Sequence, residues 1–565
     1  MTNQELAELL ALTASLMELH DENPFKVRSI QSAGFNIEKI EITLSGLSLA
    51  ELEKQEGIGK GIAAKIIEIT TTGKLAELER LISSTPEGVV ELLNIKGIGP
   101  KKVKTLWKEL AITNKDELLE ACKTNTVAKL KGFGEKTQEN IIQVLHFVMK
   151  QSDKRLYGDV EELAFNLEAK LRKELSLASS LSLSGDVRRM METIDSISFI
   201  ASGKDLAALL KQIAQQEYLI SNPAESGLYT WRGKESLQQI PIEITVCSEE
   251  QFGSVLFRHS SGKAHLQSKN SEGNTFLHAA TFKNFSTEEL LYQSFNLPFI
   301  PSEIREGQKE LSLALENKLD QLITDKDLRG SFHNHSTYSD GAHTLEEMAR
   351  YCKELGYDYF GISDHSKSAF YANGLDETRI ANQQKEIEKL NSELGSFKIF
   401  KGVESDILND GSLDYADDVL NTFDFIVASI HSNLKMNQEK ATQRLITAIE
   451  NPYTTMLGHP TGRLLLKREG YPIDHIKVID ACAANNVIIE INAHPWRLDM
   501  DWRYISYALD KGCIISINPD AHEKKGFLDM HFGVCVARKA GLCKEQTFNA
   551  WPLAQVEAWL ANKKK

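Results

Sequence analysis

The feature that most constrains the fold is a series of apolar, strand-like runs from residue 329 onward, each ending in side chains of metal-ligand type. "YDYFGISDHS", "FDFIVASIHS" and "GCIISINPDAH" are three of these runs, and helical segments such as "TLEEMARYCKELG" lie between them. Strands that alternate with helices predict parallel β/α units. Polar side chains at the carboxyl ends of successive strands are typical of a β/α barrel with its functional site on that face.

The runs supply a large set of candidate ligands. They are His333, His335, Asp340, His365, Glu404, His431, His459, Asp520 and His522. A lone histidine is more often a packed or surface residue, but these nine side chains outnumber the ligands of a mononuclear zinc site and predict a multinuclear one. The set has no cysteine, which favours Mn, Zn or Fe in nitrogen and oxygen coordination. Such centres hydrolyse phosphoesters.

Further polar residues lie near these runs and are candidates for holding substrate phosphate. They are Asn492, on the strand-like run "NNVIIEINAHPWRLD", and Arg463, Arg468 and Arg497 in predicted loops after strands. Arginine suits phosphate because its planar fork presents several donors at once. The alternative for each arginine is an ordinary solvated surface position.

The first part of the chain repeats a Gly-apolar-Gly motif between an apolar helix and a lysine-rich helix start. The glycines are Gly57 and Gly59, Gly97 and Gly99, and Gly132 and Gly134, and the lysines after them include Lys60, Lys101, Lys102 and Lys136. The glycines permit a tight turn and let a phosphate approach the amides at the start of the second helix. The motif resembles the helix-hairpin-helix, which holds a nucleic-acid backbone without reading sequence.

Bulk composition limits the compartment and the partners. The 565 residues carry a net charge of −14, which disfavours nucleic-acid binding on average, so the local clustering of lysines matters more. The seven cysteines are scattered without a CxxC pair, which favours a reducing cytoplasm. The beginning, "MTNQELAELLALTASLMELH", is amphipathic and acidic, unlike a signal peptide, and no run reaches transmembrane length. We therefore expect a cytoplasmic protein without a membrane partner.

The middle of the chain predicts an α+β region that contains a hairpin, "LSLSGDVRRMMETIDSISFIAS". Its turn carries Gly185, Arg188 and Arg189, a combination suited to gripping phosphate. The following strand, however, offers the hydroxyls of Ser196 and Ser198 where a metal-dependent phosphate site needs carboxylates.

The motifs HxH…D, DH, GxE, xIH, GHP, EINAHPWRLD and PDAH strongly resemble the PHP (polymerase and histidinol phosphatase) family. The resemblance implies a distorted seven-stranded β/α barrel with three divalent metals, for which Mn is the first expectation and Zn or Fe the alternatives. It places His333, His335, Glu404 and Asp520 on one metal, and Asp340, His365 and His522 on a second. A bridging Glu404 with His431 and His459 would hold the third.

The layout of the whole chain resembles the bacterial family X DNA polymerases. The resemblance implies a helical, helix-hairpin-helix lyase-like domain (1–85), helix-hairpin-helix fingers (86–152), an α+β nucleotidyltransferase-like palm and thumb (153–310), a linker (311–327) and the (β/α)7 PHP barrel (328–565). It also implies a monomeric base-excision-repair protein that binds gapped, 3′-ended or abasic DNA. Lys65 matches the Schiff-base lysine of the lyase domain, although a simple phosphate contact is the interpretation we favour.

The polymerase motif of the palm has diverged. Gly185, Arg188 and Arg189 remain, but Asp186 replaces the triphosphate-binding serine, and Ser196 and Ser198 replace the two metal-binding aspartates. The third acidic position, Glu243, cannot hold two Mg²⁺ ions alone. We therefore expect an inactive polymerase site without its Mg²⁺ pair.

The leading hypothesis is a DNA-repair nuclease whose PHP centre acts as a 3′–5′ exonuclease, with abasic-site endonuclease and 3′-phosphatase activity as further options. One alternative is an active, gap-filling family X polymerase with an altered metal site. Another is a non-catalytic factor that binds DNA ends. A small-molecule phosphatase is also compatible with the PHP fold, but would leave the hairpin repeats without a purpose.

Overall fold

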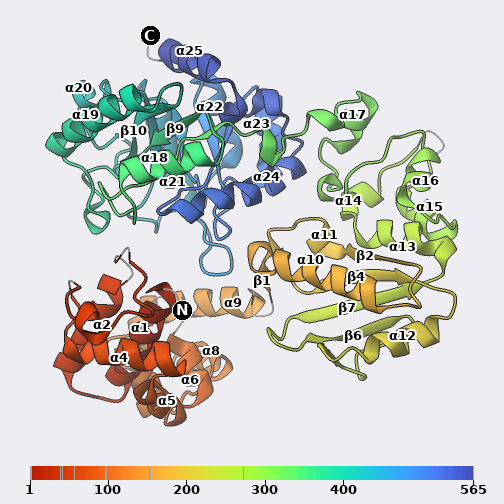
Figure 1. Cartoon of the computed structure of the whole chain (residues 1–565), viewed down its shortest axis with the longest axis horizontal. Helices are drawn as coiled ribbons and strands as arrows, with labels where there is room; N and C mark the ends of the chain where they lie inside the picture. Colours follow the sequence, from red (N-terminus) through yellow and green to blue (C-terminus); the bar gives the residue numbers. More distant parts are fainter. Residues whose placement is uncertain are drawn as a thin grey trace. The chain divides into compact units, whose positions relative to one another are not determined.

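The computed structural model describes residues 3–37, 40, 42–55, 57–93, 95, 98–151, 154–270 and 273–563. The chain forms two compact units, Met1–Ser152 and Asp153–Lys565 (Figure 1).

The described part of the first unit is helical. Its helices are α1 (Asn3–Leu19), α2 (Pro24–Ile37), α3 (Leu49–Leu52), α4 (Lys60–Thr72), α5 (Ala76–Ser83), α6 (Glu87–Leu93), α7 (Pro100–Leu110), α8 (Lys115–Lys123) and α9 (Gly134–Gln151), with a short 3-10 helix, η1 (Val127–Lys129). The apolar residue at the centre of each repeat, Ile58, Ile98 or Phe133, is buried in the shared core. This burial fixes each turn against the helices that it joins.

The second unit begins with the expected α+β region. Its elements are β1 (Arg155–Leu156), α10 (Tyr157–Glu174), β2 (Ser180–Ser184), α11 (Gly185–Arg188), β3 (Thr193–Ile194), β4 (Ile197–Ser202), α12 (Leu206–Ala214), β5 (Leu219–Ser221), β6 (Thr230–Glu235), β7 (Pro241–Cys247), η2 (Glu249–Gln251) and α13 (Phe252–His259). The five-stranded sheet has the order β2-β4-β7-β6-β5. As predicted, β2 and β4 pair antiparallel as a hairpin, and β7 is followed by a helix.

The segment between this sheet and the barrel consists of short helices, α14 (Lys263–Leu266), α15 (Phe276–Phe282), α16 (Glu288–Gln293), η3 (Ser302–Ile304), α17 (Glu310–Leu315), η4 (Leu319–Gln321) and η5 (Asp325–Asp327). Phe257, Phe276 and Tyr292 form its core around the buried guanidinium of Arg305. Arg305 is paired there with Glu288, so the buried charge is compensated.

The rest of the chain is a parallel β/α barrel, as predicted. Its strands are β8 (Gly330–Ser331), β9 (Tyr359–Ile362), β10 (Lys398–Asp406), β11 (Phe425–Ser429), β12 (Met456–Leu457), β13 (Ile488–Asn492) and β14 (Ile515–Asn518), paired in sequence order. Beyond the two edge strands, Asn334 and Ala521 form a parallel bridge, so the seven-stranded sheet is nearly closed.

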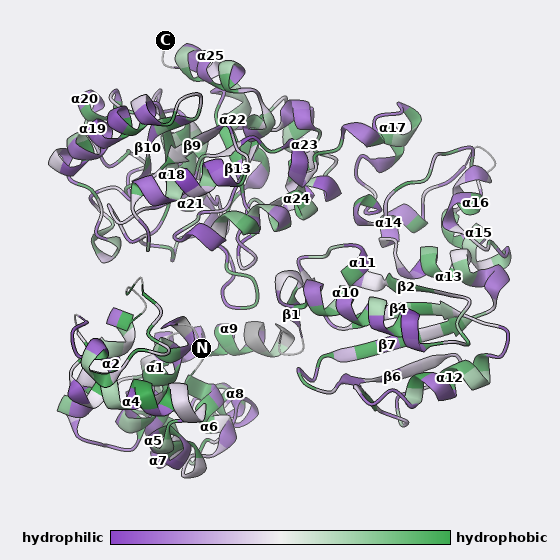
Figure 2. Cartoon of the chain, viewed as in Figure 1, coloured by the Kyte–Doolittle hydropathy of each residue, from purple (hydrophilic) through white to green (hydrophobic). Residues whose placement is uncertain are grey.

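Helices alternate with the strands of the barrel. They are α18 (Leu345–Glu354), η6 (Phe370–Ala372), α19 (Glu377–Glu393), α20 (Asp417–Leu420), α21 (Gln438–Ile449), α22 (His475–Ala484), α23 (Trp502–Asp510), η7 (Lys524–Asp529), α24 (Met530–Lys539), η8 (Lys544–Gln546), η9 (Phe548–Ala550) and α25 (Leu553–Lys563). In Figure 2, α19 is largely hydrophilic, whereas its buried residues Ile380, Ile387 and Leu390 face the core. The barrel interior is filled by aromatic rings, among them Phe332, whose ring centroid lies 5.2 Å from that of Phe425.

The predicted fold classes are thus confirmed: a helical first part, an α+β sheet and a parallel barrel. The five domain boundaries proposed from the sequence stay predictions.

Candidate metal centre

The predicted ligands gather at the carboxyl ends of the barrel strands. His333 and His335 follow β8, His365 follows β9, and Glu404 lies near the end of β10. The remaining ligands, His431, His459, Asp520 and His522, follow β11, β12 and β14, and Asp340 lies in the loop after β8. Because parallel strands carry their carboxyl ends to one face, residues far apart in sequence meet there.

Glu404 is the centre of this arrangement. Its Oε1 lies 3.0 Å from His459 Nε2, 3.1 Å from His431 Nε2 and 3.2 Å from His333 Nε2. Its Oε2 lies 2.8 Å from His365 Nδ1 and 3.7 Å from His335 Nε2. A carboxylate with one oxygen facing each of two histidine groups is placed to bridge metals.

The ligand atoms form four overlapping groups in which all atoms lie within 4.8 Å of one another. The groups are His335, Asp340, His365 and His522; His333, His335 and Asp520; His333, Glu404 and His459; and His365, Glu404 and His431. The structure therefore brings all nine predicted side chains together. It differs from the expected division in two ways: His335 also joins Asp340, His365 and His522, and His431 and His459 fall in separate groups that share Glu404.

Several buried polar atoms of this cluster lack hydrogen-bond partners within the described protein and are available to bind a metal ion. Within the described residues, His333 Nε2, His335 Nδ1, His365 Nδ1, both nitrogens of His459 and both oxygens of Glu404 have no hydrogen-bond partner of acceptable geometry. Buried polar atoms without partners are costly, and they are rare in folded proteins. Nitrogen and carboxylate donors in this number suit several divalent transition metals.

Opposite charges set the protonation of the cluster. Burial disfavours charge on His333, but Glu490, Asp520 and Glu404 outweigh it and raise its pKa well above the usual value. In the same way, Glu404 and Asp406 raise the pKa of His431 to about 10 against the effect of burial. His335 is buried beside His522 and His365, which together lower its pKa to about 3. Burial opposes ionisation of Glu404, but the surrounding histidines hold its pKa well below the usual value.

Two buried carboxylates that the sequence analysis missed orient the histidines from behind. Glu490 Oε2 lies 2.7 Å from His333 Nδ1, and Asp406 accepts a hydrogen bond from His431 Nδ1. A carboxylate on the second ring nitrogen fixes the tautomer and the orientation of a ligand histidine. The sequence did contain a sign of these two carboxylates. Asp406 lies two residues after Glu404 on one strand, and Glu490 lies two residues before Asn492 on another, so the two residues of each pair point to the same face of the sheet.

The four predicted phosphate contacts differ in position. Arg497 Nε lies 3.5 Å from Asp520 Oδ2, and Asn492 Nδ2 donates to the same oxygen at 3.0 Å, so both lie against the metal cluster. Arg463 instead pairs with Asp501 at 2.5 Å, and Arg468 donates to the Gly462 carbonyl oxygen at 2.6 Å. The last two arginines therefore hold loops in the structure, and Arg497 is the one that the structure places at the cluster.

Asp520 has an unusual backbone. Its φ of +54° is in the left-handed region, which few residues other than glycine adopt, although asparagine and aspartate do so more readily than most. The surrounding contacts to His335 and Asn492 hold it there. Such backbone strain often accompanies functional sites.

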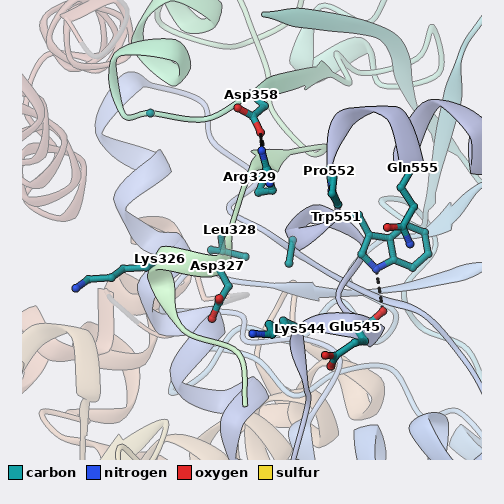
Figure 3. Close-up of a pocket in the computed structure, with 12 residues that line it drawn as sticks. Lys326, Asp327, Leu328, Arg329, Asp358, Lys544, Glu545, Trp551, Pro552 and Gln555 are labelled. Atoms are coloured by element: carbon teal, nitrogen blue, oxygen red, sulfur yellow. Dashed lines mark hydrogen bonds and ion pairs between the residues drawn. The ribbon is translucent and has the colours of Figure 1, made fainter. Parts of the chain in front are cut away.

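A separate pocket lies at the opposite end of the barrel (Figure 3). Arg329 and Asp358, which line it, precede β8 and β9 and are paired at 2.6 Å. Trp551 donates its indole N–H to the Glu545 carbonyl oxygen at 2.8 Å. None of the nine candidate ligands lines this pocket, so it is distinct from the metal cluster.

Comparisons with known proteins agree with this geometry. The PHP domain family matches residues 331–494, a helix-hairpin-helix domain matches residues 1–75, and a SAM-like helix-hairpin-helix tandem matches residues 89–146. The DNA polymerase/3′-5′ exonuclease PolX of Bacillus subtilis (strain 168) is 35% identical over 571 aligned residues, which cover 99% of each chain. The chain belongs to the bacterial family X DNA polymerases.

Other relatives match a smaller share of the chain. A probable phosphatase of Thermoanaerobacter sp. (strain X514) is 26% identical over 41% of this chain and 94% of its own length. A probable phosphatase of Acetivibrio thermocellus is 30% identical over 29% of this chain and 65% of its own length. These relatives support hydrolytic chemistry for the PHP domain.

The residues at the positions expected for a polymerase site contact other protein residues. Ser196 Oγ and Ser198 Oγ lie 3.4 Å apart, and Glu243, beside Ser198 in the neighbouring strand, is paired with Arg232 at 2.7 Å. Asp186 is paired with Arg189 at 3.1 Å. Glu243, the one carboxylate left at the three acidic positions expected for a family X palm, is therefore neutralised by Arg232.

The retained arginines of the palm face protein carboxylates. Arg188 donates two hydrogen bonds to Glu288, at 3.0 and 2.6 Å. Arg189 donates two to Glu306, both at 2.8 Å. Bidentate pairs of this kind are strong and specific. The two arginines that the sequence suggests for gripping phosphate thus hold α16 and the segment after η3 in this structure.

The helix-hairpin-helix modules present helix starts with free space around them. Gly59 and Gly99 are the residues before α4 and α7, and an added Cβ at either would meet nothing within 4 Å. Gly57 has a φ of +80°, and an added Cβ would lie 2.1 Å from Asn36 Nδ2, so glycine is required there. Gly132 and Gly134 also have positive φ, whereas Gly97 lies outside the described residues.

The lysines of these modules divide into exposed and paired ones. Lys60, Lys101 and Lys136 are exposed, although the Lys101 ammonium also lies 3.8 Å from Glu18 Oε1. The Lys102 ammonium lies 5.7 Å from the Phe133 ring centroid. Lys65 forms an ion pair with Glu77, which also pairs with Lys26. An ion-paired ammonium is a poor nucleophile because it must first lose its proton.

The described helices were also compared with the requirements of a membrane span, and each of them is too short or too polar to cross a bilayer.

Proposed function

We propose that this chain is a PolX-type DNA repair protein whose PHP domain hydrolyses phosphodiesters at the 3′ ends of DNA. The observation that carries the proposal is the convergence of five histidines on the buried carboxylate of Glu404. A bound metal in such a site activates water and stabilises the charge that develops on phosphoryl oxygens. The printed name of the Bacillus subtilis relative includes a 3′-5′ exonuclease, in agreement with this chemistry.

The side chains of the chain would divide the work. The nine clustered ligands would hold three divalent metals, with Mn as the proposed ion. Arg497, beside Asp520, adds a positive charge for nonbridging phosphate oxygens. Asn492 donates a hydrogen bond to Asp520 Oδ2 and so holds this carboxylate in place, while Asp520 Oδ1 faces His335 Nε2. Glu490 and Asp406 hold the ring orientations of His333 and His431.

The helix-hairpin-helix modules would supply DNA affinity through backbone phosphates rather than bases. Gapped, 3′-ended and abasic DNA are the proposed substrates. Lys65 is proposed as a structural or phosphate-contacting residue because of its pairing with Glu77. The five domain ranges expected from the family layout, and a monomeric, cytoplasmic protein, form part of the same proposal.

We propose further that the polymerase site is inactive. Two Mg²⁺ ions need several anionic oxygens, whereas this palm offers two serine hydroxyls and a carboxylate paired with Arg232. The competing proposal, an active gap-filling polymerase, draws on the printed name of the Bacillus subtilis relative.

The decisive experiment measures hydrolysis of 5′-labelled single strands and abasic duplexes by Mn²⁺-loaded protein without nucleotide. His335→Ala and Asp520→Ala should each lower the rate at least about 100-fold, because each removes a charge or donor from the centre. His278→Ala, an exposed histidine outside the barrel, is the matched control and should leave the rate unchanged. Unchanged activity in both cluster variants would contradict the site. Metal bound without any hydrolysis would favour a DNA-end binding factor.

A further inference from the structure

We propose that Phe370 and Tyr371 form a stacking platform for the unpaired base of the 3′-terminal nucleotide of a DNA strand. The proposal rests on the proposed function, since the phosphate to be cleaved is the one that the metal cluster would take. It names a recognition element for that substrate that none of the candidate ligands provides.

The two rings are presented to solvent by a turn that buries its small residues. Phe370 is 88% exposed and Tyr371 67% exposed, and they are adjacent in η6. Ala369 and Ala372, on either side of them, are 0% and 1% exposed. A single exposed aromatic residue is common. A turn that buries its two alanines and exposes its two aromatic rings, however, leaves in water the side chains whose burial would stabilise the fold most.

The turn is held firmly in this arrangement. Gly374 N donates to Ala369 O at 3.1 Å, and Leu375 N donates to His365 O at 2.9 Å. Arg379 Nη1 donates to the Asn373 carbonyl oxygen at 2.8 Å. Gly374 is required because an added Cβ would lie 1.9 Å from Ser366 O. A backbone that is fixed before binding loses little further conformational entropy when a ligand stacks on the side chains that it carries.

Tyr371 places the platform beside the metal cluster, and Phe370 is its neighbour in η6. The Tyr371 ring centroid lies 6.3 Å from that of His365, and His365 Nδ1 lies 2.8 Å from Glu404 Oε2. In a nucleotide the base is joined to its phosphate through one sugar, so a phosphate at the cluster brings its base to the rim where these rings lie. Stacking on aromatic side chains tolerates every base, because each has a π face.

This placement favours a strand end over a small phosphate ester. An ester without a planar group would leave both rings in water and gain nothing from the turn. An unpaired terminal base gains apolar contact on binding, whereas a base in a duplex is already stacked on its neighbours and would have to leave them first.

The test compares substrates with and without a 3′-terminal base, each with the wild-type protein and with variants that lack one of the two aromatic rings. Hydrolysis is measured on a single strand that ends in thymidine and on the same strand ending in an abasic tetrahydrofuran nucleotide. Phe370→Ala and Tyr371→Ala should lower kcat/KM for the thymidine end about 5- to 100-fold and for the abasic end less than about twofold. Phe370→Trp should retain the preference, and Phe370→Leu should lose it.

The matched control is Phe282→Ala, which removes a phenylalanine that is 74% exposed in α15, outside the barrel. It should leave both rates unchanged. Equal losses on both substrates, or no loss on either, would overturn the platform.

A binding measurement keeps the platform testable if no hydrolysis is found. A strand with 2-aminopurine at its 3′ end is bound to Asp520→Ala protein, and stacking is followed as quenching of the fluorescence. Quenching that disappears when both rings are replaced by alanine supports the platform even in a protein that does not cleave. Quenching that persists in that variant overturns it, whatever the outcome for the proposed function.

Discussion

The carboxylate of Glu192, in the palm hairpin, accepts a hydrogen bond of 3.1 Å from the indole nitrogen of Trp502, at the start of barrel helix α23. Arg503 donates to the other oxygen of Glu192 at 2.7 Å. Glu192 is only 8% exposed, and although burial opposes its ionisation, Arg503 keeps its pKa below the usual value. A buried carboxylate between β2 and β4 thus joins the α+β region to the barrel.

Two residues at the end of barrel helix α24 make further contacts of this kind. Lys539, at the end of α24, is fully buried and pairs with Glu306 at 3.3 Å, the carboxylate that also holds Arg189. Arg538 pairs with Glu303 at 2.7 Å. Arg189 and Lys539 therefore share the Glu306 carboxylate, which links the α+β region to the barrel.

We expect Glu192→Gln to weaken this seam. The loss of charge leaves Arg503 with Asp501 as its remaining carboxylate partner, and because Arg503 is partly exposed the change should cost about 1 kcal/mol of unfolding free energy. Chemical denaturation followed by tryptophan fluorescence measures the change. Asp195→Asn, an exposed acid on the same hairpin, is the control and should have little effect. Equal stability of wild type and Glu192→Gln would show that the pair is energetically neutral.

We expect no nucleotide incorporation by the wild-type protein on gapped DNA with either Mg²⁺ or Mn²⁺, since Glu243 is already paired with Arg232. A primer-extension assay with purified protein measures this. Incorporation that is present in the wild type and disappears in Glu243→Ala, but survives in Glu250→Ala, would establish a working palm and refute the prediction.

We expect Glu490→Gln and Asp406→Asn to weaken metal binding about 10- to 100-fold, because each removes the carboxylate behind a ligand histidine. Competition with a fluorescent chelator for Mn²⁺ measures the affinity. Glu388→Gln, on the exposed face of α19, should bind as the wild type does. Unaltered affinity in both carboxylate variants would exclude an orienting role.

We expect Asp529→Asn to stabilise the protein increasingly as pH rises. Burial, assisted by the nearby Glu523, raises the pKa of Asp529 from 3.8 to about 7. The folded state therefore binds this proton more tightly than the unfolded state, and wild-type stability falls as pH rises from about 4 to about 7. The asparagine variant does not titrate there and escapes this loss.

The thermal midpoints of wild type and Asp529→Asn, compared at pH 5 and pH 8, test this expectation. The variant should gain more over the wild type at pH 8 than at pH 5. Asp418→Asn, in the exposed first turn of α20, should differ from the wild type by the same amount at both pH values. A difference for Asp529→Asn that does not change with pH would contradict the raised pKa.

We expect Lys101→Ala and Lys102→Ala each to lower the slope of log affinity against log salt by about 1, if each lysine neutralises one phosphate. Fluorescence anisotropy with labelled DNA at several salt concentrations measures the slope. Lys123→Ala, at the end of α8, should leave it unchanged. Slopes that stay the same in both lysine variants would place the DNA elsewhere.

The sequence was most informative where residue type and position follow one periodicity. Nearly all of the nine candidate ligands lay at predicted strand ends, so the barrel brings most of them together, and Asp340 joins them from the loop after β8. The inner carboxylates were harder to find, because Glu490 resembles any acid on a strand until burial shows that it faces His333.

The arginines show where sequence reasoning ends. Arg463, Arg468 and Arg497 are alike in sequence, all in loops after strands, yet only Arg497 lies against Asp520. Arg188 and Arg189 likewise matched a phosphate-binding turn, but their partners, Glu288 and Glu306, are 100 and 117 residues away. Whether an arginine binds a ligand or a distant protein carboxylate depends on tertiary contacts, which the spacing of residues in the sequence does not reveal.

The near-closure of the barrel has a consequence for biosynthesis. His335 and Asp520 meet across 185 residues, and the bridge between Asn334 and Ala521 forms only when the last strand is in place. A growing chain on the ribosome therefore carries its first ligands long before it carries the last ones. Contacts this distant form slowly, so the metal centre stays incomplete until the residues after β14 have been made and have folded against β8.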